Sequence, residues 1–185
     1  MGLFSFLRRS KKKQRNSEAI APKVPLFEEV YEIVDLRFCS NPLTSDESTI
    51  ISEEILEKIL RTLLVDLPAY VEKLGENPSH QQKELAEIDR QLRVKGVERI
   101  GSSEWSYSSG NGIAARVIVH GKSRTALVGM SGAMRRAVVD YPASISELVE
   151  RSSATGNDSF ILAIDGLAYG ACEVSHRIQE VKSSD

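Results

Sequence analysis

Apolar residues recur every three or four positions over the second quarter of the chain. Between residues 51 and 64 they form one stripe, made of Ile51, Ile55, Leu56, Ile59, Leu60, Leu63 and Leu64. This helical period predicts an amphipathic helix over residues 46–64. Thr44 followed by Glu47 matches a capping box, which predicts where the helix starts.

Proline, glycine and serine positions predict how the helical segment is divided. Pro68 interrupts the first helix, and Gly75 ends the short continuation that follows. Ser79 with Gln82 repeats the capping box and opens another helix, whose apolar positions are Leu85, Ile88 and Leu92. We therefore expect residues 44–95 to be helical.

After Gly96 the apolar period changes to the alternation that is typical of strands. Asn111-Gly112 and Asp165-Gly166 are residue pairs that tight hairpins prefer, so the strands beside each pair are expected to be antiparallel neighbours. Residues 30–38 also alternate and predict a strand, with a helix beginning near Phe27 as the alternative. The other predicted strands are 97–107, 113–120, 124–130, 160–164 and 167–174.

Two shorter helices and the chain end complete the prediction. Ser131 is expected to cap a helix that Pro142 ends, and another helix covers residues 145–151. The last ten residues are expected to form a fraying helix. From residue 79 the order is therefore helix, three strands, helix, two strands and a final helix.

This order predicts a single α+β domain over residues 26–185, with an antiparallel sheet of about five strands covered on one face by helices. Residues 44–95 form its helical segment, and residues 97–183 form the sheet with its helices. The order over residues 79–185 resembles that of class I type III secretion chaperones. The resemblance implies a small, acidic, dimeric protein that binds the targeting segment of another protein.

The N-terminal residues combine apolar and aromatic side chains with cations and contain no acid. The apolar members are Leu3, Phe4, Phe6 and Leu7, and the cations are Arg8, Arg9, Lys11, Lys12, Lys13 and Arg15. The chain has 24 Lys and Arg against 26 Asp and Glu, so subtracting these six leaves 18 against 26, a formal charge of −8 on residues 16–185. Residues 1–25 are therefore expected to be a disordered basic tail and linker on an acidic body.

Apolar anchors beside a polybasic run are the features that bind an anionic membrane surface. The cations follow the apolar residues, which is the reverse of a secretory signal, and no run of about 18 apolar residues is present to span a membrane. We therefore expect a cytoplasmic protein that is peripheral at the inner face of a membrane. The alternatives are a tail that only keeps the protein soluble and a tail that binds nucleic acid, against which the acidic body argues.

The best catalytic motif is Gly129-Met130-Ser131-Gly132-Ala133, which lies between a predicted strand and a helix as a nucleophile elbow does. Asp158, Asp165 and His176 follow in the order of hydrolase triads. The link before this strand is too short for the crossover that an α/β-hydrolase sheet needs, so we expect Ser131 to cap its helix. The same turn is a candidate anion site, formed by Ser131, Gly132, Arg135 and Arg136.

No residue pattern predicts a metal centre or a cofactor. Cys39 and Cys172 are far apart in the sequence, and so are His80, His120 and His176. We expect the histidines to be polar surface positions and neither catalytic residues nor ligands. The cysteines fit a reducing compartment.

Together these patterns predict a non-enzymatic adaptor, chaperone-like or regulatory protein that binds another protein near a membrane. The stripe of the helix is wider than a surface helix needs. We expect a partner or a second copy to cover it, in preference to its own sheet, at Ile51, Ile55, Ile59 and Leu63. A hydrolase or phosphate-binding protein that uses the Ser131 turn is the first alternative, and nucleic-acid binding through the tail is the second.

Overall fold

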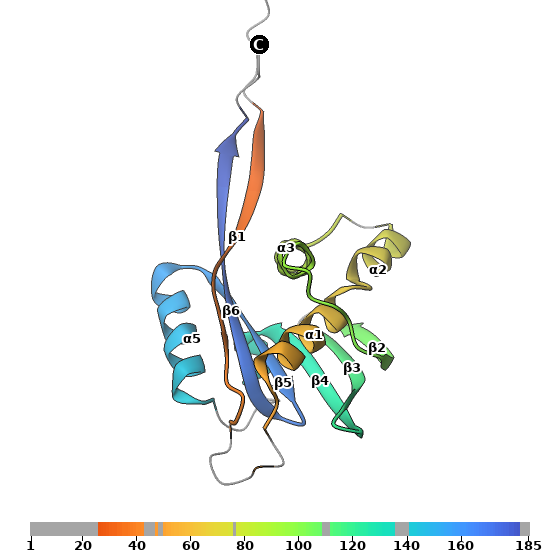
Figure 1. The fold of residues 1–185 in the computed structure, drawn as a ribbon. Helices are drawn as coiled ribbons and strands as arrows, with labels where there is room; N and C mark the ends of the chain where they lie inside the picture. The colour runs from red at the N-terminus through yellow and green to blue at the C-terminus, as the bar shows by residue number, and fades with distance from the viewer. Residues whose placement is uncertain are drawn as a thin grey trace, which may run out of the picture.

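The computed structural model describes residues 26–42, 47, 50–75, 77–108, 112–135 and 141–181. Its centre is a six-stranded sheet with the order β1-β6-β5-β4-β3-β2, and all neighbouring strands are antiparallel (Figure 1). The strands are β1 (Phe27–Phe38), β2 (Ser102–Ser108), β3 (Gly112–Val119), β4 (Lys122–Met130), β5 (Asp158–Ile164) and β6 (Leu167–Glu180). The helices are α1 (Glu53–Leu64), α2 (Leu67–Leu74), α3 (His80–Val94), α4 (Ser131–Met134) and α5 (Ala143–Thr155). The α+β class is as predicted.

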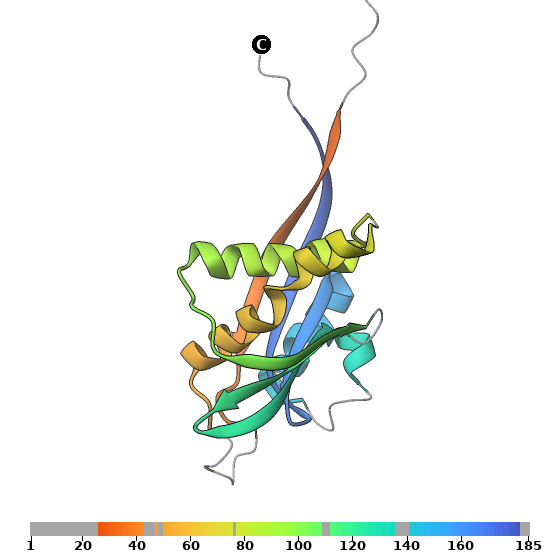
Figure 2. The ribbon, with the colours of Figure 1, turned by 90° about the vertical axis from the view of Figure 1, so that its right-hand side faces the viewer.

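Helices cover both faces of this sheet. α1, α2 and α3 pack on one face, over a core that includes Val128 and Phe160, and α5, with α4, packs on the other face, over Ile161 and Ala163 (Figure 1). Figure 2 looks onto the face that α1, α2 and α3 cover. Successive residues of a strand point to opposite faces, so Phe160 and Ile161 lie in different cores. The prediction of helices on one face only was wrong because β5 and the first half of β6 are buried on both faces.

Local signals place α2 and α3 as the sequence predicts. Gly75 ends α2 at a φ of 65°, a left-handed conformation that favours glycine because it has no Cβ. The capping box of α3 is confirmed, since the Ser79 hydroxyl accepts from the Gln82 amide and the Gln82 side chain accepts from the Ser79 amide. α1 begins at Glu53, with Ser52 as its N-cap, and not at residue 46. Thr44 lies outside the described residues.

Among the last ten residues, those up to Glu180 form a strand and not a fraying helix. β6 continues to Glu180 and pairs with β1, which places Tyr31 opposite His176. Past the helices, the two strands continue as a ribbon toward the C-terminus (Figure 1). The predicted strand over residues 30–38 is confirmed as the greater part of β1, and it brings the sheet from about five strands to six.

The apolar stripe of α1 is buried within its own chain. Ile51, Ile59 and Leu63 are at most 2% exposed, and the half-buried Ile55 packs against the same core. The expectation that a partner or a second copy covers these side chains was wrong. The stripe is wide because α1 contacts α3 as well as β3 and β4.

The predicted membrane-binding residues, Leu3 to Arg15, lie outside the described residues. Within the part of the chain that the structure describes, no helix is long and apolar enough to cross a membrane.

Candidate functional site

Side chains from four elements meet where α3 begins, at the N-terminal end of β5. His80 and Glu84 come from α3, Asp158 from the start of β5, Tyr31 from β1 and His176 from β6. Helical spacing places His80 and Glu84 on the same face of α3. We call these five residues the histidine corner.

His80 is the centre of the histidine corner. Its Nε2 lies 3.4 Å from Oε1 of Glu84 and 3.5 Å from Oδ2 of Asp158. Its Nδ1 lies 3.1 Å from the hydroxyl of Tyr31, which donates a hydrogen bond to Glu29 at 3.0 Å. The hydroxyl oxygen of Tyr31 therefore accepts from Nδ1–H of His80. This pattern assigns the hydrogen to Nδ1 and turns the Nε2 lone pair toward the two carboxyl groups.

Glu84 is a buried carboxyl group whose oxygens lack hydrogen-bond donors. Its side chain is 1% exposed, and neither carboxylate oxygen has a hydrogen-bond partner. Burial, together with the nearby charge of Asp158, raises the pKa of Glu84 to about 8. Glu84, His80 and Asp158 each offer one ligand atom, and these atoms lie within 4.8 Å of one another. These three side chains could therefore hold a divalent cation.

The three rings of the histidine corner contact one another. Tyr31 and His176 stack with ring centroids 5.0 Å apart, and His80 meets His176 edge to face at 4.5 Å. The His80 side chain is 44% exposed and His176 is also exposed, so these two rings are open to solvent, whereas Tyr31 is half-buried. Burial raises the pKa of Tyr31 to about 12, with a further contribution from its hydrogen bond to Glu29, so its hydroxyl stays protonated.

The sequence pattern treats these histidines as separate surface positions, but the structure brings two of them together. The contact depends on the pairing of β1 with β6, which joins the two ends of the domain. One local signal was present, because Glu84 follows His80 at the helical i+4 position. His120 lies apart from the site, exposed in the turn between β3 and β4.

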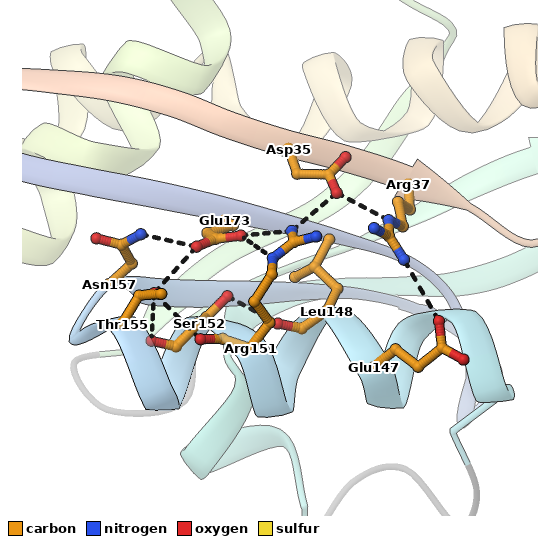
Figure 3. A network of polar contacts seen from close by, with 9 residues as sticks. All are labelled: Asp35, Arg37, Glu147, Leu148, Arg151, Ser152, Thr155, Asn157 and Glu173. Atoms are coloured by element: carbon orange, nitrogen blue, oxygen red, sulfur yellow. Dashed lines mark hydrogen bonds and ion pairs between the residues drawn. The ribbon is translucent and has the colours of Figure 1, made fainter.

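A second polar cluster, on the opposite face of the sheet, joins α5 to β1 and β6 (Figure 3). Nη2 of Arg151 lies 2.8 Å from Asp35 and 2.5 Å from Glu173. The buried Glu173 also accepts a hydrogen bond from Asn157 at 2.7 Å. Glu173 is therefore fully compensated, unlike Glu84, and the Arg151 cluster stabilises the packing of α5.

The Ser131 turn differs from the prediction. Ser131 is the first residue of α4, and Met130 is the N-cap, so Ser131 does not cap the helix. Its hydroxyl accepts a hydrogen bond from Ser159 at 2.8 Å. Of the other proposed anion-binding residues, Gly132 and Arg135 are exposed and Arg136 lies outside the described residues.

The described residues do not assemble the hydrolase triad. Asp165 pairs with Arg124 at 2.9 Å, at the end of β5 away from Ser131. His176 contacts α3 on the opposite face of the sheet from α4. The nucleophile-elbow pattern around Ser131 is therefore a strand-to-helix turn.

Comparisons with known proteins show the fold. No known protein-family profile and no curated protein matches the sequence. A crystal structure of a zinc-transporting PIB-type ATPase matches 80% of this chain with a TM-score of 0.53 and 12% sequence identity. A second crystal structure of a zinc-transporting PIB-type ATPase, in another state, matches 80% with a TM-score of 0.51 and 13% identity. The chain shares its fold with a segment of these pumps.

The chain spans 19% of the length of each of these zinc-transporting ATPases. The N-domain of HMA8, a copper-transporting P-type ATPase, gives a TM-score of 0.48 at 10% identity, with 77% of this chain and 98% of that domain covered.

Proposed function

We propose that this chain is a regulatory module that binds an adenine nucleotide at the histidine corner. The observation that carries the proposal is the cluster of three contacting rings, Tyr31, His80 and His176, of which the two histidines are exposed to solvent. Aromatic rings stack on nucleobases, and each stacked base contributes about 1–3 kcal/mol to the binding free energy. Asp158, whose side chain is 35% exposed beside these rings, could accept a hydrogen bond from an exocyclic amino group.

The fold supports the choice of nucleotide. The similar structures belong to ATPases, whose substrate is ATP, and a shared fold alone does not carry a function. The contacting rings of the histidine corner supply the side chains that could bind the base, which a shared fold does not specify. Because the chain spans 19% of those pumps, we propose nucleotide binding and not ion transport. The Ser131 hydroxyl accepts from Ser159, which does not activate it as a nucleophile, so the proposal includes no catalysis.

ATP binding should depend on the exposed ring of His176. In a chelator-containing buffer, His176→Ala should weaken ATP binding about tenfold, because it removes one stacking surface. His120→Ala is the matched control, since His120 is exposed in the β3–β4 turn, and it should bind as the wild type does. Isothermal titration with ATP, ADP, AMP and GTP measures both variants. Equal ATP affinity of the His176→Ala variant and the wild type, or no saturable binding of any nucleotide, contradicts the proposal.

We further propose that the basic tail holds this module at the anionic inner face of a membrane, where it acts as an adaptor for another protein. The support is the sequence of residues 3–15, in which apolar anchors precede six cations. Each cation near an anionic surface contributes on the order of 1 kcal/mol. Residues 16–185 carry a net negative charge, which an anionic surface repels, so the tail is the element that such a surface attracts.

Co-sedimentation with anionic vesicles tests the tail. Wild-type protein should bind and should be released by salt, because exposed charges are screened over roughly 10 Å at 0.1 M. A variant in which Gln replaces five of the cations should remain in the supernatant. These five are Arg8, Arg9, Lys11, Lys12 and Lys13. Unchanged sedimentation of this variant argues against electrostatic binding, and no sedimentation of the wild type argues against a membrane role.

A further inference from the structure

We infer that the histidine corner binds one divalent transition-metal ion through Nε2 of His80 and the carboxylates of Glu84 and Asp158. The three ligand atoms come from α3 and β5, and they lie within 4.8 Å of one another. The inference does not depend on nucleotide binding, because the metal is held by protein groups alone.

The distances from His80 to the two carboxylates are those of ligands around a metal. Metal–nitrogen and metal–oxygen bonds are about 2.0–2.2 Å long, so two ligand atoms at a tetrahedral angle lie about 3.4 Å apart. Nε2 of His80 lies 3.4 Å from Glu84 and 3.5 Å from Asp158. Direct hydrogen bonds between nitrogen and oxygen are shorter, about 2.7–3.2 Å. The two distances from Nε2 of His80 to the carboxylates therefore fit a shared cation.

Glu84 is the second and independent observation. Its side chain is 1% exposed, and both its oxygens lack a hydrogen-bond partner. An ionised carboxylate in this position is costly, and more so beside the carboxylate of Asp158. On the other face of the sheet, Arg151 compensates the equally buried Glu173. At the histidine corner the neighbouring Lys83 pairs with Glu29 instead, so a bound cation would supply the missing positive charge.

The surroundings of His80 match those of a metal ligand. Metal-binding histidines donate their second ring N–H to an oxygen that orients the ring and fixes the tautomer. Here Nδ1 of His80 bonds to Tyr31, and Tyr31 donates to Glu29. This relay directs the Nε2 lone pair toward the two carboxylates. Tyr31 is thus a positioning residue for the metal site.

The donor set selects the class of metal. One neutral imidazole and two carboxylates balance a charge of +2 and suit ions such as Zn²⁺, Mn²⁺ or Co²⁺. Mg²⁺ and Ca²⁺ prefer oxygen ligands alone. Three protein ligands leave a fourth position for water or a small ligand, and the partial exposure of His80 and Asp158 gives access to it.

Titration of tag-free full-length protein with Zn²⁺ and Co²⁺, after removal of metals and without nucleotide, tests the site. We expect one ion for each chain and a visible absorption spectrum typical of low-symmetry, four-coordinate Co²⁺. Glu84→Gln keeps the shape of the side chain and should weaken Zn²⁺ binding more than about 100-fold, because changes to outer-shell residues alone cost about 10–100-fold. His120→Ala should leave the affinity unchanged. Circular dichroism confirms that each variant is folded.

Tyr31→Phe separates positioning from ligation. It should keep the stoichiometry and weaken Zn²⁺ binding about tenfold, because the His80 ring loses its hydrogen-bond acceptor. An unchanged affinity would overturn the role of Tyr31. Equal affinity of Glu84→Gln and the wild type, or no saturable binding by the wild type, would overturn the metal site. ATP binding in chelator should survive Glu84→Gln, so failure of the metal site and failure of the nucleotide proposal are distinguishable.

Discussion

Replacing Ile59 by Asp is expected to abolish the cooperative thermal transition of the protein. Ile59 is fully buried in the core between α1 and the sheet. Truncation of a buried isoleucine alone costs about 2–5 kcal/mol, and an unpaired carboxylate in its place adds several more. The sum is comparable with the whole free energy of unfolding of a typical domain, about 5–15 kcal/mol.

Ile118→Asp is the matched control for Ile59→Asp. Ile118 lies on β3 and is 59% exposed, so this variant should melt within a few degrees of the wild type. Differential scanning calorimetry, with size-exclusion chromatography for the oligomeric state, measures both. A folded Ile59→Asp protein that has only changed its oligomeric state would contradict the burial of α1 in its own chain and restore the interface hypothesis.

Helix ends and tight turns were predictable because their determinants are local. The capping box of Ser79 and Gln82 and the hairpin at Asp165-Gly166 each depend on residues that are close in sequence. The strand at residues 175–180 was not predictable in this way. Its residues are mostly polar and exposed, and they become a strand because they pair with β1 at the other end of the domain.

The same long-range pairing explains why the histidine corner was missed. Tyr31 and His176 become neighbours only when β1 pairs with β6, and Asp158 joins them through β5. The spacing of His80 and Glu84 was visible in the sequence. The pair is a candidate site because Glu84 is buried, and the local sequence does not predict that burial.

Arg151→Met is the second change with a large expected effect. Arg151 is 40% exposed, but it bridges Asp35 and the 1% exposed Glu173 (Figure 3). Removing one partner of a fully buried ion pair costs about 3–5 kcal/mol. Because Arg151 is partly solvated and Asn157 still donates to Glu173, we expect a smaller but clear decrease in the free energy of unfolding at pH 7, measured by urea unfolding.

The decrease in stability caused by Arg151→Met should depend on pH. Burial alone would raise the pKa of Asp35 and Glu173. Hydrogen bonds from Arg151 and Arg37 nevertheless lower the pKa of Asp35, and hydrogen bonds from Asn157 and Arg151 lower the pKa of Glu173. A carboxyl whose pKa is lowered by folding stabilises the protein above its ordinary pKa, and this stabilisation is lost as the pH falls through the lowered value. The difference between the wild type and Arg151→Met should therefore be largest at pH 7 and shrink as the pH falls below about 4.

Arg177→Met provides the control for the Arg151 experiment. Arg177 faces Glu32 at 3.7 Å across β6 and β1, and both side chains are at least 60% exposed. Exposed pairs contribute about 0–1 kcal/mol, so this variant should lose little stability at any pH. Equal losses for Arg177→Met and Arg151→Met, or a loss for Arg151→Met that does not change between pH 7 and pH 4, would show that the ion pairs of Arg151 do not hold α5 on the sheet.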